Sequence, residues 1–153
     1  MDAFEYDAFI SYSHRDLKWA RWIQEKLETF PIPDGADEPF AQRRRMRVFR
    51  DQTDLAGVEV TASLRRELRL SRSLVVVCSP NSAASRWVND EVAYFEELGR
   101  QDRIIAFIVS GEPDSDRPEL ECYPPRMRST EERALLGANV QEIGRTKALL
   151  KVV

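Results

Sequence analysis

Residues 74–78 read Leu-Val-Val-Val-Cys, an uninterrupted apolar run rich in β-branched side chains. Valine favours extended backbone because its branched Cβ packs well on a pleated surface. A strand that is apolar at every position is typical of a sheet covered on both faces. Residues 79–82, Ser-Pro-Asn-Ser, then break the run. The stretch therefore predicts a central strand of a parallel sheet.

Strand-like and helix-like segments alternate on both sides of this run. The expected strands are Tyr6–Tyr12, Met46–Phe49, Leu74–Cys78, Ile104–Val109 and a short one near Ala138–Val140. The expected helices are Leu17–Phe30, Thr61–Leu70, Ser85–Leu98 and a last one from Arg145, and residues 111–128 are expected to form a long loop. Strands that alternate with helices predict an α/β fold with a parallel sheet wrapped by helices on both faces.

The chain has the size and composition of one globular domain, residues 1–153, with 42% hydrophobic and 32% charged residues. Its longest apolar runs fall far short of the roughly 20 residues that a membrane helix needs. The net charge of -3 gives no general attraction to nucleic acid, so the basic run Arg43–Arg45 is interpreted as a solvated loop. The apolar end, Ala148–Val153, is typical of the N-terminal part of a longer multidomain protein, although a docked terminal helix has the same pattern.

The cysteine and histidine content excludes several kinds of site. With two cysteines and one histidine, the chain has neither a disulfide scaffold nor a metal site built from several histidines, and a reducing, cytosolic compartment is expected. Cys78 ends the buried strand and is interpreted as an inert core thiol. His14 lies between a strand and a helix, where both a solvated loop residue and a ligand contact fit the sequence.

The loops at the carboxyl ends of the strands are the expected place for a ligand. In parallel sheets ligands bind outside these ends, which here are the loops after Tyr12, Phe49 and Cys78. The sequence contains neither a Gly-x-x-x-x-Gly-Lys phosphate loop nor the Gly-x-Ser-x-Gly turn of hydrolases. The sequence therefore predicts where a ligand binds, but these motifs do not identify the reaction.

The third expected helix carries an unusual pair of side chains. Val88, Val92 and Phe95 are spaced to pack on the sheet. Trp87 and Glu91, four residues apart, share a neighbouring face near the start of the helix. Two interpretations remain open: Trp87 fills the edge of the core beside a solvated Glu91, or the two form part of a site at the rim of the sheet.

Three segments resemble the motifs of the Toll/interleukin receptor (TIR) domain, in that family's order. They are Tyr6–Ser13 at the first strand, Val48–Gly57 across the second strand and the following BB loop, and Ser85–Glu91 at the start of the third helix. The resemblance spans Tyr6 to Leu98. It implies a flavodoxin-like, three-layer fold with a central five-stranded parallel sheet.

The resemblance also implies one of two functions. Some TIR domains only associate with other TIR domains, whereas others cleave NAD at the nicotinamide–ribose bond, in immune or cell-death signalling. The catalytic members carry a glutamate where Glu91 stands, and many pure adaptors lack it. The resemblance therefore implies that Glu91 is catalytic, that NAD is the substrate, and that neither a separate cofactor nor a metal is needed.

A single carboxylate is sufficient for this reaction. Nicotinamide leaves as a neutral molecule from a positively charged pyridinium, so no general acid is needed, unlike in ordinary glycosides. A carboxylate that binds the ribose hydroxyls stabilises the positive charge that develops on the sugar, and a dry pocket strengthens the effect. Trp87 is expected to form an apolar wall of that pocket. Attack by water gives ADP-ribose, and attack by a group of the same molecule gives a cyclic isomer.

The loop after the first strand is expected to contact the diphosphate or the adenine-linked ribose. Family members often place basic side chains there, whereas this chain has Ser13 and His14, followed by Arg15. Arg15, or failing that Arg50, is expected to supply the missing charge. Backbone N–H groups at the start of the first helix are the alternative phosphate contact.

The loop Asp51–Gly57 is expected to mediate self-association. In the family this BB loop docks on a neighbouring protomer and closes over its site, so Leu55 and Ala56 are expected beside the substrate. Gly57 permits the positive φ that such a bend requires. The resemblance thus implies a cytoplasmic, NAD-cleaving TIR domain that works in assemblies, with no nucleic-acid partner and no membrane span.

Overall fold

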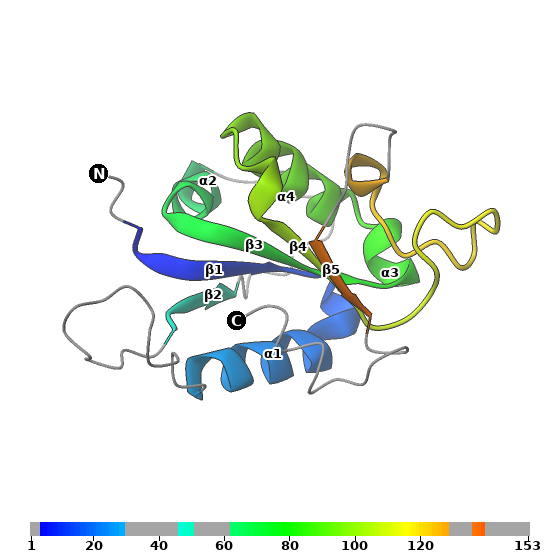
Figure 1. Ribbon diagram of the computed structural model, residues 1–153, viewed down its shortest axis with the longest axis horizontal. Coiled ribbons are helices and arrows are strands. Elements are labelled where there is room, and N and C mark those ends of the chain that lie inside the picture. Colours follow the sequence, from blue (N-terminus) through cyan, green and yellow to red (C-terminus); the bar gives the residue numbers. More distant parts are fainter. Residues whose placement is uncertain (1–3, 30–45, 51–61, 129–135, 140–153) are drawn as a thin grey trace.

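A parallel sheet organises the fold in the computed structural model, which describes residues 4–29, 46–50, 62–128 and 136–139. The strands are β1 (Tyr6–Ser11), β2 (Val48–Arg50), β3 (Ser71–Cys78), β4 (Ile104–Ile108) and β5 (Leu136–Asn139). They pair in the order β2-β1-β3-β4-β5, and all neighbours are parallel (Figure 1). The order reverses between β1 and β3, so the carboxyl ends of these two strands are where such a fold favours a ligand.

Helices cover both faces of the sheet. They are α1 (Leu17–Thr29), α2 (Ala62–Arg69), α3 (Pro80–Ala83) and α4 (Arg86–Glu97), with the 3-10 turns η1 (His14–Asp16), η2 (Gln101–Arg103) and η3 (Pro125–Met127). Helix α1 lies on one face, and α2 and α4 lie on the other (Figure 1). The predicted α/β class, with helices on both faces of a parallel sheet, is confirmed. Among the described residues, no helix is both long and apolar enough to cross a membrane.

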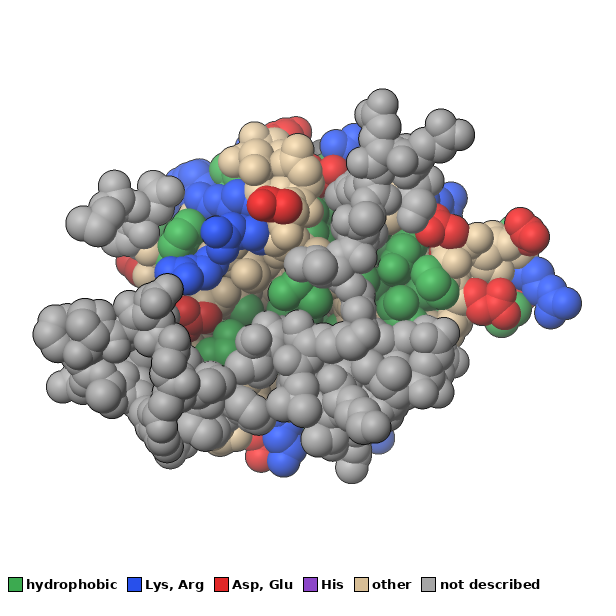
Figure 2. All heavy atoms as spheres, viewed as in Figure 1, with side chains coloured by type: hydrophobic (Ala, Val, Ile, Leu, Met, Phe, Trp, Pro, Cys, Tyr) green, Lys and Arg blue, Asp and Glu red, His purple; other side chains and the backbone are tan. Residues whose placement is uncertain are grey.

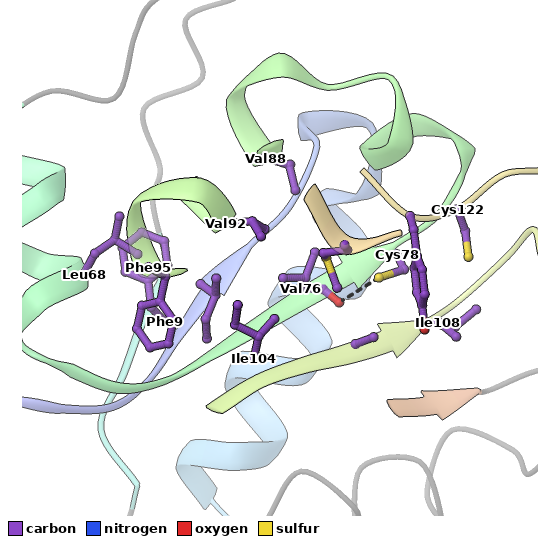
Figure 3. Close-up of a cluster of buried hydrophobic side chains, with 14 of the residues drawn as sticks. Phe9, Leu68, Val76, Cys78, Val88, Val92, Phe95, Ile104, Ile108 and Cys122 are labelled. Carbon is purple, nitrogen blue, oxygen red and sulfur yellow. Dashed lines mark hydrogen bonds between the residues drawn. The ribbon is translucent and has the colours of Figure 1, made fainter. Parts of the chain in front are cut away.

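The side chains of β3 alternate between the two faces of the sheet. Leu74, Val76 and Cys78 pack in the cluster formed with α2 and α4, whereas Val75 and Val77 pack in the cluster formed with α1. All are fully buried, and Figure 3 shows side chains of α4 pointing onto the first cluster. Fully burying a valine or leucine contributes about 1.5–3 kcal/mol. The prediction of a strand covered on both faces is therefore confirmed, and β3 joins the two halves of the core.

The two cysteines are free and buried, which confirms the core position predicted for Cys78. Burial raises the pKa of Cys122 to about 12 and holds the pKa of Cys78 well above its usual range. Folding raises these pKa values because burial disfavours the charged thiolate. The contribution of the thiols to the free energy of unfolding is therefore fully present below the ordinary thiol pKa of about 8.5. This contribution is lost progressively as the pH rises from there toward the folded pKa of Cys122, about 12.

Both thiols are expected to resist alkylation in the folded protein at a pH of about 8, because only the thiolate is the nucleophile and burial suppresses it. After unfolding in urea, the same thiols should react at the rate of a free cysteine. Mass spectrometry after a timed pulse of iodoacetamide measures both rates. Alkylation of Cys78 at similar rates before and after unfolding would contradict its burial in the core.

The structure moves several predicted boundaries. Strand β3 begins at Ser71, ahead of the predicted Leu74. Its first residues are polar, but their backbone pairs with the start of β1. Strand β5 begins at Leu136 rather than near Ala138. The helix predicted from Arg145 lies outside the described residues. Apolar runs therefore locate the buried centres of strands better than their ends.

A short helix forms where the sequence predicts only a break. The Ser79 hydroxyl accepts hydrogen bonds from the backbone N–H groups of Asn81 and Ser82, and Ser82 Oγ accepts from the N–H of Ser79. Pro80 lies in the first turn of the helix, where backbone N–H groups have no intrahelical partner, so the N–H that proline lacks costs no hydrogen bond. This reciprocal capping box starts α3 at the end of β3. The predicted break of the strand is confirmed, since β3 ends at Cys78. The short helix itself was not predicted, because capping groups rather than apolar periodicity specify it.

The predicted long loop, residues 111–128, returns to the core. A bridge pairs Glu112 with Glu121, and Glu121 Oε2 accepts hydrogen bonds from the N–H groups of Asp114 at 2.9 Å and Tyr123 at 3.2 Å. The buried apolar residues that follow are Cys122, Tyr123 and Met127. This segment packs in the same cluster as α4, so it contributes to the core as well as connecting β4 to the chain that follows.

Arginine side chains gather over α2 on the face shown in Figure 2. Exposed Arg66 pairs with Glu5 at 3.4 Å and Glu67 at 2.9 Å. Arg65 lies over the ring of Tyr94 in α4, and Arg69 donates to the Tyr94 hydroxyl at 3.0 Å. Exposed ion pairs contribute only about 0–1 kcal/mol each. These arginines therefore join α2 to α4 and to the start of β1 at the end of the sheet away from the β1 and β3 carboxyl ends.

Candidate functional site

Glu91 projects from α4 into the interior of the protein. Val88, Glu91, Val92 and Phe95 form one stripe of the helix at the spacing i, i+3, i+4, i+7, and all are fully buried. Figure 3 shows Val88 and Val92 pointing from this helix toward the sheet. The interpretation of Glu91 as a solvated residue is therefore wrong, because its place in the helix puts its carboxylate in the row that faces the sheet.

Ser11 holds the carboxylate of Glu91. It is the last residue of β1, it is fully buried, and its hydroxyl donates to Glu91 Oε1 at 2.7 Å. Burying a carboxylate costs several kcal/mol unless hydrogen bonds compensate, and a hydroxyl that donates to a carboxylate forms one of the stronger bonds available. The pair thus places an oriented acidic group at the carboxyl end of β1, beside the point where the strand order reverses.

Trp87 lies one residue from the buried stripe of α4. It is half-buried and packs against the cluster that α4 forms with the sheet, so it fills the edge of the core as one interpretation expected. Glu91, four residues later, faces farther inward and is fully buried. The structure therefore places the aromatic side chain at the rim and the carboxylate beneath it, on adjoining sides of one helix.

The turn after β1 presents two exposed side chains at the same end of the sheet. Ser13 is buried; its hydroxyl accepts from the N–H of Arg15 at 3.4 Å, and its carbonyl accepts from the N–H of Asp16 at 2.8 Å. These bonds close η1, and His14 and Arg15 in this turn are exposed. Ser13 thus shapes the turn, whereas His14 and Arg15 offer their side chains to solvent.

Arg50 lies on the other face of the sheet from Glu91. It is the register partner of Ile10, which belongs to the cluster that packs with α1. Its Nε donates to Gln24 of α1 at 2.7 Å, and its Nη1 donates to the Tyr12 hydroxyl at 3.1 Å. The guanidinium is thereby tied to α1, and the structure does not bring it together with Glu91.

Other predicted site residues, Leu55 and Ala56, lie outside the described residues, as does the rest of the loop Asp51–Gly57. Sequence reasoning missed Ser11, whose only signal is a small polar residue at the end of an apolar strand. It also missed Asp16, a buried acid in η1. Among the described residues, no group of three histidine, cysteine or acidic side chains is placed to hold a metal ion.

Comparison with known proteins finds a matching family model and similar chains. Residues 9–114 match the family described as "Thoeris protein ThsB, TIR-like domain". "NAD(+) hydrolase ApTIR" of Actinoplanes sp. is 34% identical over 132 residues, which are 80% of this chain and 18% of that protein. The TIR domains in a solved structure of the activated Roq1 resistosome, which recognises the pathogen effector XopQ, align with a TM-score of 0.48 and 22% identity, over 69% of this chain and 57% of that chain.

The chain thus spans 18% of the length of the curated relative that it matches. The family match runs from β1 through α4 and β4 to the loop beyond, and so includes Ser11, Trp87 and Glu91. The sequence motifs, the strand order of the sheet and the family match all indicate the same family. The chain belongs to the TIR-like domain family of the Thoeris protein ThsB.

Proposed function

We propose that this domain cleaves NAD at the nicotinamide–ribose bond and releases nicotinamide with ADP-ribose or a cyclic isomer. The observation that carries the proposal is the buried carboxylate of Glu91, oriented by Ser11 at the carboxyl end of β1. The similarity to a protein named as an NAD(+) hydrolase supports NAD as the substrate and hydrolysis as the reaction. The activity of a relative much longer than this chain is thereby assigned to this one domain.

Glu91 acts on the charge that develops during bond cleavage. As nicotinamide departs, positive charge grows on the ribose, and a fixed carboxylate stabilises it more in a dry interior than in water. The Ser11 hydroxyl keeps Oε1 in one place, so little reorganisation is needed when the charge appears. The reaction needs no second carboxylate, because the leaving group is already neutral once the bond breaks.

The proposal requires that the ribose reach a carboxylate that is fully buried. Trp87, half-buried at the rim above it, is the side chain that would flank the nicotinamide end and exclude water. At the other end, exposed Arg15 and the start of α1 at Leu17 both favour an anion, which supports a diphosphate contact there. Arg50 is a weaker choice because it is already bonded to α1.

Replacing Ser11 with alanine is expected to lower kcat for NAD about ten- to a hundredfold, because a hydrogen bond to a charged group contributes about 1.5–3 kcal/mol. The KM should change little, since Glu91 itself remains. The matched control is Ser71→Ala, which removes an equally buried hydroxyl that donates to the Glu67 carbonyl at 2.7 Å at the start of β3. Equal kcat values for the two variants would remove Ser11 from the mechanism.

We also propose that NAD cleavage by this domain serves immune or cell-death signalling in the cytoplasm, in assemblies that form through the loop Asp51–Gly57. The match to a domain of a Thoeris protein and the two free thiols, which suit a reducing compartment, support this setting. The contrasting function is that of an interaction module without catalysis, as in adaptor members of the family.

One experiment separates catalysis from association alone. NAD consumption is measured over a wide range of protein concentration, with and without a crowding agent, and light scattering follows the size of the particles. A catalytic assembly is expected to gain specific activity as particles grow. Constant specific activity would mean that each monomer holds a complete site, and particle growth without NAD loss would identify an interaction module.

A further inference from the structure

A buried polar cluster joins the carboxyl ends of β1 and β3. Asp16, only 7% exposed, ends η1 after β1. Its Oδ2 accepts a hydrogen bond from the Ser79 hydroxyl at 2.5 Å, and its Oδ1 accepts from Asn81 Nδ2 at 3.1 Å. Both carboxylate oxygens are therefore held by groups at the end of β3 and the start of α3.

The cluster continues into the backbone of α3 and the core. Ser79 Oγ accepts from the N–H groups of Asn81 and Ser82, so the hydroxyl that binds Asp16 also caps the helix. Ser82 Oγ in turn lies 3.4 Å from the carbonyl oxygen of Cys122, to which it donates. The turn after β1 is thus connected through α3 to a segment buried beside α4.

The Asp16 carboxylate is bound by Ser79 and Asn81 rather than used only to cap α1. An acidic residue before α1 stabilises that helix through its dipole when its carboxylate lies at the helix N-terminus. Here the carboxylate instead points across to the neighbouring strand end, at the cost of its own burial. The N–H of Asp16 also donates to the carbonyl of Ser13, so Asp16 fixes the whole turn that presents His14 and Arg15.

We propose that Asp16 is a positioning residue for NAD binding, acting through Ser79 and Asn81. It holds the turn Ser13–Arg15 at a set distance from the end of β3, so that Arg15 and the turn meet the diphosphate while the ribose reaches Glu91. This inference rests on the proposed cleavage of NAD. It assigns Asp16 to substrate affinity, whereas Ser11 and Glu91 are assigned to the chemical step.

The test is steady-state kinetics of Asn81→Ala, which removes one bond to Asp16 at a half-buried position and leaves Asp16, Ser79 and Arg15 in place. The KM for NAD is expected to rise about three- to tenfold, with kcat within about twofold of wild type. Asp16→Asn should raise the KM further. The asparagine amide has only one acceptor oxygen, so either the Ser79 hydroxyl or Asn81 Nδ2 then meets an N–H group in place of an acceptor. Ser71→Ala, at the opposite end of β3, is the control for lost stability and should leave the KM unchanged.

Each outcome decides between a positioning role and a structural one. A higher KM in both cluster variants, with wild-type KM in Ser71→Ala, supports the proposal. An unchanged KM in Asn81→Ala and Asp16→Asn, with lower thermal stability, would make the cluster purely structural while NAD cleavage stands. If the wild-type protein neither binds nor cleaves NAD, the proposed function fails, and the role of Asp16 fails with it. If Asp16→Asn does not fold, Asn81→Ala alone decides.

Discussion

Replacing Glu91 with glutamine is expected to lower the rate of NAD cleavage by at least about a hundredfold. Glutamine keeps the size of the side chain, and its carbonyl oxygen can still accept the hydrogen bond from Ser11, but it lacks the negative charge that stabilises the ribose cation. The fold should be unharmed, because exchanging a buried charge for a neutral group removes a desolvation cost. We therefore expect activity to fall while the midpoint of thermal unfolding stays level or rises.

A fall in activity without a fall in stability distinguishes a catalytic role of Glu91 from a role in core packing. The matched control is Glu97→Gln, which removes an exposed carboxylate from the same helix and should leave both quantities unchanged. Kinetics are compared with thermal unfolding followed by circular dichroism. A Glu91→Gln variant that keeps most of the wild-type rate would show that the buried carboxylate is not the catalytic group.

Replacing Gly111 with alanine is expected to destabilise the protein by about 2–4 kcal/mol, the sum of backbone strain and overpacking. Gly111 has a φ of +83°, and an added Cβ would lie 2.5 Å from the carbonyl oxygen of Leu120 and 3.1 Å from both Cys122 Cβ and Pro80 Cδ. The first of these is backbone that is tied into the loop by a hydrogen bond from Glu112, so it cannot easily move aside. Urea unfolding measures the loss.

Gly99 provides the comparison for Gly111. It follows the C-cap residue of α4, Leu98, and has a φ of +78°, but an added Cβ there meets nothing within 4 Å. Gly99→Ala should therefore cost only the strain of the left-handed backbone, about 1 kcal/mol. The difference between the two variants isolates the close approach of the loop to the core. Equal losses would mean that the loop relaxes around the new methyl group.

The repeating apolar patterns are what made the fold predictable from the sequence. Residues 74–78 are apolar at every position because both faces of β3 are covered. Val88, Val92 and Phe95 identify the buried side of α4 because their spacing follows the helix. In each case the signal depends only on neighbours in the chain, so it is visible before any tertiary contact is known.

The site was less predictable because its contacts join distant segments. Glu91 and Ser11 are 80 residues apart, and their hydrogen bond exists only because α4 packs over the end of β1. Asp16 and Ser79 are likewise 63 residues apart. Helical spacing alone already places Glu91 in the row of Val88 and Val92, yet residue type favoured a solvated position. A charged residue in an apolar row is therefore better interpreted by its spacing than by its polarity.

The most direct measurement of the central claim is nicotinamide release by the wild-type domain. The protein is incubated with NAD over a range of concentrations, with a crowding agent, and chromatography follows NAD, nicotinamide, ADP-ribose and its cyclic isomers, with Glu91→Gln run alongside. The proposed mechanism predicts that nicotinamide appears as fast as NAD disappears, in equal amount to an ADP-ribose product, and only with the wild type. No nicotinamide from folded wild-type protein, or equal release by Glu91→Gln, would contradict it.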